Sequence, residues 1–384
     1  MKQPVARLEC ASCGRTEYKM TAKPVGEEIP DSCSRCHGDM IVKERGELPD
    51  QLNMVGSLVN KNFYVWDFSM TPQRMEFSVE SDDPKESFSN LLGKLDKKGY
   101  VAVMRERDEE LGLAIRKKPK IEKGRIWVNV VLFLATIGTT FGIAGYLFLY
   151  QDFLSAGLFS SSLLLILGSH ELGHKITAQE HRIHASLPYF IPAPTIIGTF
   201  GAIIKTKSPI PSKEALVEMG ANGPVLGFAI ALPIALIGLL LSEPTGGEIL
   251  QTIPPPLIFT ILGTLTIGSV SNTLSLHPLA FASLIGFFVT WLNLMPAGQL
   301  DGGHVTRGLL SKESHFFLGR MIGFTLILMG FVWILFLFWG FLILFVFGKP
   351  HSGALDDVSE LSKKQKVLAF GALTIFILCL PIPI

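Results

Sequence analysis

The sequence predicts a polytopic α-helical membrane protein, with about six transmembrane segments plus re-entrant elements, that follows a smaller polar N-terminal part. Of the 384 residues, 48% are hydrophobic and 17% are charged, whereas about 25% of the residues in a soluble domain are charged. Most of the charge lies before about residue 125, and the later sequence alternates apolar runs with short charged loops. The net charge is only +1. We expect no nucleic-acid partner, because neutralising phosphates requires a concentrated basic surface.

Two cysteine pairs lie near the start of the polar part. Cys10 and Cys13 form one C-x-x-C pair, Cys33 and Cys36 form the other, and 19 residues separate the pairs. This spacing is typical of a four-thiolate zinc ribbon. Binding of one structural Zn²⁺ would contribute about 10 kcal/mol or more to folding a segment that is too short to bury a core of its own. We therefore expect a cytosolic zinc-ribbon domain over residues 1–48.

The alternative to metal binding, a pair of disulfides, requires an oxidising compartment. Met1-Lys2-Gln3-Pro4 leads into polar sequence rather than into the apolar region of a secretory signal peptide. We therefore expect a cytosolic N-terminus with reduced thiols. Four cysteines complete a tetrahedral site, so His37 is expected to face solvent, and Cys379, in the last apolar run, is expected to pack as a small hydrophobic residue.

A small cytosolic α+β domain is predicted over residues 54–118. Residues 63–68 and 75–79 alternate like strands, and Asp83 begins a helix with an apolar face. Residues 100–104 and 111–115 then form a hairpin around a charged turn. No catalytic constellation occurs in this ββαββ unit. We expect a structural or partner-binding role for it.

The membrane domain is predicted over residues 126–384. The expected transmembrane segments include residues 127–149, 153–178, 215–241, 279–295 and 367–380. A basic stretch precedes the first of them, and by the positive-inside rule it holds the preceding domains in the cytosol. This stretch consists of Arg116, Lys117, Lys118, Lys120, Lys123 and Arg125.

Three apolar runs do not fit a single crossing. Residues 185–204 are interrupted by prolines and glycines, which indicates a re-entrant loop or hairpin that is buried in protein. Residues 257–268 are too short to span. Residues 316–347 are too long for one crossing, and they form either a short hairpin near Gly330 to Gly340 or one tilted helix.

The pentapeptide His170-Glu171-Leu172-Gly173-His174 lies at the end of the second predicted segment. Histidines at i and i+4 share one helical face, so both imidazoles can bind one zinc ion while Glu171 acts as general base toward water on the metal. Lys175 and Arg182 follow directly and indicate that this end of the segment is cytosolic. The motif predicts a hydrolytic metal site in the membrane.

A third ligand is predicted from the fourth segment, which returns the chain to the cytosolic side. The sequence from Asn293 to Gly303 follows that segment and places Asp301 at the depth of His170. A catalytic zinc ion has three protein ligands and one open position. A lone aspartate here is more often a helix cap, but an ionisable residue in a membrane costs several kcal/mol unless it is paired. We therefore expect Asp301 to be the third ligand.

These motifs, in this order, resemble the site-2 protease family of intramembrane zinc metalloproteases over about residues 126–384. The resemblance rests on His170–His174, Gly198–Gly201, Lys207–Pro211, Gly220–Pro224 and Asn293–Gly303. The α+β domain and the segment Leu355–Val358 are most similar to the cyanobacterial and chloroplast branch, to which this chain adds the ribbon. Asn222 replaces a residue that is small in many members. We interpret it as a packing variant that could also line the site.

The resemblance implies an endopeptidase that cleaves peptide bonds in or near transmembrane segments of other membrane proteins. It implies that His170, His174 and Asp301 bind one catalytic Zn²⁺, that Glu171 is the general acid/base, and that Asn293 orients substrate or stabilises an oxyanion. One predicted strand edge resembles the family's strand that pairs with extended substrate. It consists of Gly198, Thr199, Phe200 and Gly201. We expect a location in the cell membrane, with the active site near the cytosolic side, and homo-oligomerisation stays open.

Two other functions fit parts of the sequence. A non-proteolytic membrane scaffold would use the ribbon to bind a partner, but the metal ligands and Glu171 are intact. A CaaX prenyl protease would complete its site with a downstream glutamate, but no glutamate between His174 and Asp301 lies in a suitable helical motif. Three further histidines, His181, His184 and His304, are expected to be solvated or to face headgroups, because two histidines and an aspartate complete the set.

Overall fold

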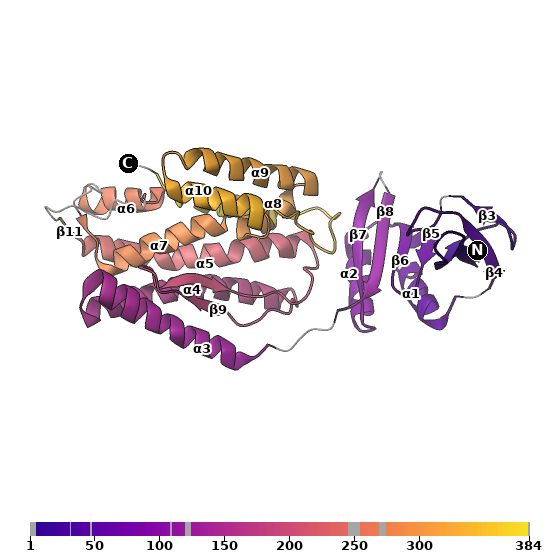
Figure 1. Ribbon diagram of the computed structural model, residues 1–384, viewed down its shortest axis with the longest axis horizontal. Helices are drawn as coiled ribbons and strands as arrows, with labels where there is room; N and C mark the ends of the chain where they lie inside the picture. Colours follow the sequence, from indigo (N-terminus) through magenta and orange to yellow (C-terminus); the bar gives the residue numbers. More distant parts are fainter. Residues whose placement is uncertain are drawn as a thin grey trace. The chain divides into compact units, whose positions relative to one another are not determined.

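The computed structural model describes residues 5–30, 32–46, 48–107, 110–119, 124–244, 254–268 and 274–382. Lys120 and Lys123 of the basic stretch lie outside the described residues. The chain divides into two compact units, Met1–Lys120 with Leu355–Glu360, and Ile121–Ala354 with Leu361–Ile384 (Figure 1).

The first unit is built on one antiparallel sheet whose strand order is β3-β4-β1-β2-β5-β6-β8-β7. The strands are β1 (Val5–Cys10), β2 (Thr16–Met20), β3 (Glu28–Ile29), β4 (Met40–Arg45), β5 (Tyr64–Met70), β6 (Met75–Glu80), β7 (Tyr100–Arg107) and β8 (Glu110–Lys117). The cysteine-bearing part and the α+β part meet where β2 pairs with β5, through Tyr18 opposite Met70 and Lys19 opposite Ser69. Each part has its own hydrophobic cluster.

The α+β part contains the strands that the alternation predicted and two helices, α1 (Asp50–Asn60) and α2 (Pro84–Asp96). The Asp83 carboxylate accepts a hydrogen bond from the Glu86 backbone N–H at 3.0 Å, which caps α2 as its sequence predicts. Helix α1 was not predicted. It starts after Pro49 without a side-chain cap, so its N-terminus carries no clear sequence signal.

A segment from the far end of the sequence completes the first unit. The Met104 backbone N–H donates to the Leu355 carbonyl at 2.8 Å, and Met104 and Asp356 form a parallel bridge. The Leu355 side chain joins the hydrophobic cluster of the α+β part, and the Asp357 carboxylate lies 3.7 Å from the Arg105 guanidinium. Residues 355–360 therefore extend the edge of the sheet at β7.

The second unit is helical. Its helices are α3 (Ile126–Ile137), continued by the π-helix η1 (Gly138–Tyr150), α4 (Phe153–Glu180), α5 (Lys213–Leu240), α6 (Leu257–Ile267), α7 (Pro278–Asn293), α8 (Asp301–Leu309), α9 (Lys312–Met329), α10 (Ile334–Phe341), continued by η2 (Leu342–Val346), and α11 (Lys363–Leu378). Helix α5 lies among α4, α7 and α8. Two short ladders accompany the helices, β9 (Tyr189–Pro192) with β10 (Thr199–Ile203), and β11 (Glu243–Pro244) with β12 (Leu274–Ser275).

The expected count of about six transmembrane segments is not confirmed. Within the described ranges, three helices are long and apolar enough to cross a membrane, namely 126–150, 153–180 and 213–240. Helices α6, α7 and α10 with η2 are apolar but shorter. Composition alone cannot separate a short crossing from a helix that is buried in protein, and many α7 side chains are buried.

Two ambiguous apolar runs are hairpins. Residues 185–204 form the β9–β10 hairpin rather than a helix. Residues 316–347 fold as α9 and α10–η2 joined by a turn at 330–333. A Cβ atom at Gly340 would lie 2.8 Å from the Gly323 carbonyl oxygen, so the two arms of this helical hairpin are in close contact.

Candidate functional site

Helices α4 and α8 bring the three predicted metal ligands together. His170 and His174 are 5% exposed and lie on successive turns of α4. Asp301 is the first residue of α8. The Asp301 Oδ2 atom lies 3.1 Å from His170 Nε2 and 3.2 Å from His174 Nε2, and the two Nε2 atoms are 3.1 Å apart. The three donor atoms thus form a nearly equilateral triangle.

This triangle fits a zinc ion. Bonds of about 2.0–2.1 Å in a tetrahedron place ligand atoms about 3.3 Å apart, close to the separations found here. The His174 Nδ1–H donates to the Met219 carbonyl at 2.6 Å, which leaves the Nε2 lone pair available for a metal. Three protein donors leave one position of a tetrahedron for water or substrate. The residues present therefore suit a catalytic rather than a structural zinc site.

Glu171 and Asn293 border the triangle. Glu171 is 4% exposed, and its Oε2 atom has no hydrogen-bond partner among the described residues. A buried carboxylate oxygen without a partner is costly, so this atom is available for a proton or a water molecule. The Asn293 Nδ2 atom, at the end of α7, lies 3.4 Å from His170 Nε2. Both residues are thus placed beside the donor set without being part of it.

Glycines of α5 pack against all three ligand-bearing positions. A Cβ at Gly220 would lie 2.4 Å from the Asp301 carbonyl oxygen, one at Gly223 would lie 2.2 Å from His174 Nε2, and one at Gly227 would lie 3.1 Å from the His170 Cβ. The sequence shows Gly220 and Gly223 only as part of the Gly220–Pro224 motif, and it does not single out Gly227. Their role depends on the contact between helices, which periodicity cannot reveal.

We expect Gly223→Ala to weaken zinc binding at the histidine site by at least about tenfold, because the new methyl group has to displace the His174 ring. Competition with a chelator would measure the affinity. Gly371→Ala on α11 is the matched control, since nothing lies within 4 Å of that position. An unchanged affinity in the Gly223 variant would contradict this packing argument.

The predicted substrate edge lies in the β9–β10 hairpin. Gly198, with φ +81°, forms the turn, and its carbonyl accepts a hydrogen bond from Thr139 Oγ1 at 2.6 Å. Thr199 and Gly201 lie in β10, which pairs with β9 alone among the described strands. Phe200 is 72% exposed. One edge of β10 is therefore without a strand partner in the described chain.

The four ribbon cysteines also converge. The Cys10 and Cys36 Sγ atoms are 3.5 Å apart, those of Cys13 and Cys33 are 3.7 Å apart, and all four lie within 4.8 Å of one another. Bonds of about 2.3 Å in a tetrahedron place sulfur atoms about 3.8 Å apart, so the cluster suits a structural zinc ion. His37 is exposed, as expected, and does not belong to the cluster.

Glu17 supports the second cysteine pair and was not singled out in the sequence. Its fully buried carboxylate accepts hydrogen bonds from the Ser34 backbone N–H at 3.1 Å and the Ser34 hydroxyl at 2.5 Å. Burial disfavours the charged form, but these hydrogen bonds and the nearby Lys19 ammonium hold the pKa of Glu17 below its usual value. The charged carboxylate thus anchors the loop between Cys33 and Cys36.

The remaining candidates lie outside the metal-binding sets. His181 Nε2 is 2.7 Å from Glu218 Oε2, and Gln365 Nε2 donates to the other oxygen of Glu218 at 2.7 Å. His184 is exposed. Asn222 donates to Thr177 Oγ1 at 2.8 Å, which supports the packing interpretation.

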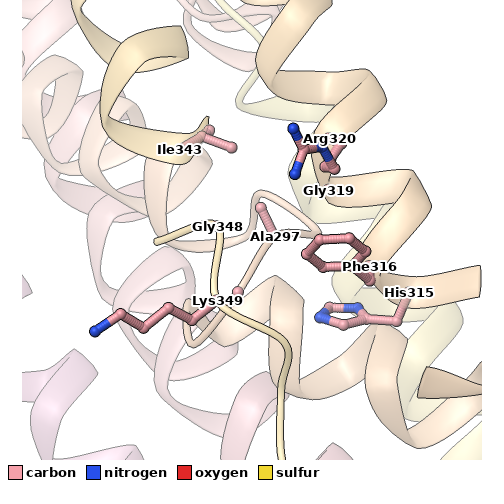
Figure 2. A pocket seen from close by; sticks show the side chains of 9 residues that line it. Ala297, His315, Phe316, Gly319, Arg320, Ile343, Gly348 and Lys349 are labelled. Atoms are coloured by element: carbon pink, nitrogen blue, oxygen red, sulfur yellow. The ribbon is translucent and has the colours of Figure 1, made fainter. Parts of the chain in front are cut away.

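Cys379 is fully buried in a hydrophobic cluster, as expected. A separate small pocket lies beside the turn before Asp301, between that turn and α9, and contains none of the ligands (Figure 2). It is lined by Ala297, Gly298, His315, Phe316, Gly319, Arg320, Ile343, Gly348 and Lys349.

Comparison with known proteins also points to zinc-dependent peptide hydrolysis. The family model described as "Peptidase family M50" matches residues 158–337, a range that contains both the histidine motif and Asp301. The chain is 33% identical over 248 residues to "Probable zinc metalloprotease EGY1, chloroplastic" of Arabidopsis thaliana, covering 60% of this chain and 44% of that protein. It is 29% identical over 232 residues to "Probable zinc metalloprotease EGY2, chloroplastic" of the same plant, covering 57% and 40%.

A third relative is "Probable zinc metalloprotease EGY3, chloroplastic" of Oryza sativa subsp. japonica, 26% identical over 279 residues, with 65% of this chain and 46% of that protein covered. The chain thus spans less than half the length of these relatives. No solved structure matches the chain. Residues 158–337 thus contain a domain that matches peptidase family M50, and the relatives that the chain resembles are described as probable zinc metalloproteases of the chloroplast.

Proposed function

We propose that this protein is an intramembrane zinc metalloendopeptidase that hydrolyses peptide bonds in or near transmembrane segments of other membrane proteins. One observation carries the proposal: His170, His174 and Asp301 meet within 3.2 Å of one another in the apolar helical unit. Glu171, with an unpartnered buried oxygen, lies next to them in the sequence. A non-proteolytic scaffold would need neither this convergence of three metal ligands nor Glu171.

Each residue has a distinct task in this proposal. A zinc ion held by the two histidines and Asp301 would supply the Lewis acidity that activates water and polarises a carbonyl group. Glu171 accepts the proton of the attacking water and passes it to the amine of the leaving peptide. The Asn293 amide orients the scissile carbonyl or stabilises its developing negative charge.

The β10 edge is the proposed substrate platform. A transmembrane helix satisfies its peptide groups internally, so its peptide bonds become accessible only after unwinding. An edge strand can replace the lost hydrogen bonds by strand addition. The Ile204 backbone, directly after β10, forms a hydrogen bond with the Glu171 carboxylate. This contact supports the proposal because it links the end of the strand to the proposed general base.

We propose a cytosolic N-terminus and an active site near the cytosolic side. Arg116, Lys117, Lys118 and Arg125 precede α3, and Lys175 and Arg182 surround the end of α4. The shorter apolar helices would complete about six membrane segments together with the three long ones. The four-cysteine cluster would hold one structural zinc ion in addition to the catalytic one.

Reconstitution with a single-span model substrate tests the function. The full chain in proteoliposomes should cleave such a substrate, lose the activity on treatment with a chelator and regain it with added Zn²⁺. Zinc analysis should find two ions per chain, one for each donor cluster. A scaffold would bind one ion and cleave nothing. A prenyl protease would cleave a prenylated C-terminal peptide and leave the single-span substrate intact.

A further inference from the structure

His304 lies one helical turn after Asp301 on α8 and is only partly buried. It is close enough to Asp301 and His174 to interact electrostatically with both. A Cβ at Gly220 would lie 2.4 Å from the Asp301 carbonyl oxygen and 2.8 Å from the His304 Cβ. Gly220 thus packs closely against both Asp301 and His304. Among the described residues, His304 belongs neither to the four-cysteine cluster nor to the set of His170, His174 and Asp301.

A hydrogen-bond chain fixes which ring nitrogen of His304 carries hydrogen. The Gly353 backbone N–H can only donate, and it lies 2.9 Å from His351 Nδ1. His351 Nδ1 is therefore an acceptor, and the hydrogen of the neutral ring is on Nε2. His351 Nε2 lies 2.9 Å from His304 Nδ1, to which it donates. The neutral His304 ring must then carry its hydrogen on Nε2.

The direction of these hydrogen bonds, from Gly353 through His351 to His304, requires His351 to be neutral. His351 is 2% exposed and lies in the loop between η2 and α11, outside the helices. Burial, together with the neighbouring His304 and His315 rings and Arg307, lowers the pKa of His351 to about 3. The ring is therefore uncharged at neutral pH and is a fixed donor toward His304.

Among the described residues, His304 forms hydrogen bonds through Nδ1 with His351 and through its backbone N–H with the Leu300 carbonyl, which leaves the Nε2–H group without a partner. The side chain retains some exposed surface. An amide hydrolase needs hydrogen-bond donors that meet the negative charge developing on the scissile carbonyl oxygen. A histidine locked in one tautomer beside the metal ligands provides such a donor without transferring a proton.

We propose that His304 is a catalytic residue whose Nε2–H stabilises the developing oxyanion, and that His351 is a positioning residue that fixes the His304 tautomer. This inference rests on the proposed peptidase function. His304 would be a second hydrogen-bond donor to the oxyanion, in addition to Asn293. It lies on α8, the helix that begins with Asp301. No bond to His304 forms or breaks during the step.

Four variants of the full chain in proteoliposomes test the roles. Glutamine places an amide nitrogen near the position of histidine Nε2, whereas leucine has no donor. We expect His304→Leu to lower kcat by about 10²–10³-fold with little change in KM, and His304→Gln to retain most of the activity. His351→Leu should lower kcat and His351→Gln should restore it. Exposed His184→Leu is the control.

Nitrogen-15 NMR of histidine-labelled, zinc-free protein provides a readout that is independent of turnover. The wild type should show hydrogen on His304 Nε2 and a bare Nδ1, and His351→Leu should show mixed tautomers. Hydrogen on Nδ1 in the wild type, or equal kcat for His304→Leu and the wild type, would overturn the inference while leaving the peptidase intact. Failure of the wild type to cleave any single-span substrate would instead overturn the proposed function.

Discussion

Glu171→Gln is expected to retain both zinc ions and to lower cleavage of a single-span substrate by at least about 10³-fold. Glutamine has nearly the same shape as glutamate but cannot accept the proton of the attacking water. Glu171 is not one of the three donors, so the metal set of His170, His174 and Asp301 stays complete. Zinc analysis and quantification of cleavage products in the same proteoliposomes would measure both effects.

The control for this variant lies on the same helix. Glu180→Gln removes an exposed carboxylate nine residues later on α4 and should leave activity unchanged. If Glu171→Gln kept substantial activity with zinc bound, another residue would have to be the base, and the proposed mechanism would be wrong. If the variant lost zinc as well, Glu171 would have to contribute to metal binding, contrary to the donor triangle.

The metal site shows how far sequence reasoning reaches. The i, i+4 spacing on a helix predicts that His170 and His174 share a face, and charge asymmetry predicts that the chain returns to the same depth at Asp301. The structure brings all three donors together. Both predictions rest on helical periodicity and crossing direction, which are properties of local sequence, and the membrane sidedness stays a prediction.

Features that depend on contacts between distant segments could not be predicted. The α5 glycines acquire their role from the helices that they touch, and His351 reaches His304 across 47 positions of sequence. Apolar composition likewise predicted about six crossings, whereas three described helices have the required length. A helix buried among other helices and a helix that faces lipid have similar compositions, so counting apolar runs cannot separate them.

Asp301→Ala is expected to reduce the zinc content from two ions per chain to one and to abolish cleavage. The substitution removes one of three donors and the only carboxylate in the set, leaving two neutral imidazoles that bind zinc far more weakly. The ion that remains should be the one held by the cysteines. Cys36→Ser should therefore remove that second ion, and the double variant should contain none.

Glu218→Ala is the matched control for Asp301→Ala, because it also removes a largely buried carboxylate of the helical unit. Its oxygens contact His181 and Gln365 rather than the donor triangle, so zinc should be retained. The loss of these contacts should lower the free energy of unfolding by about 1–3 kcal/mol. Zinc loss in both variants would mean that zinc content reports general destabilisation. Loss in the Asp301 variant alone would assign the third ligand and separate this site from one completed by a glutamate.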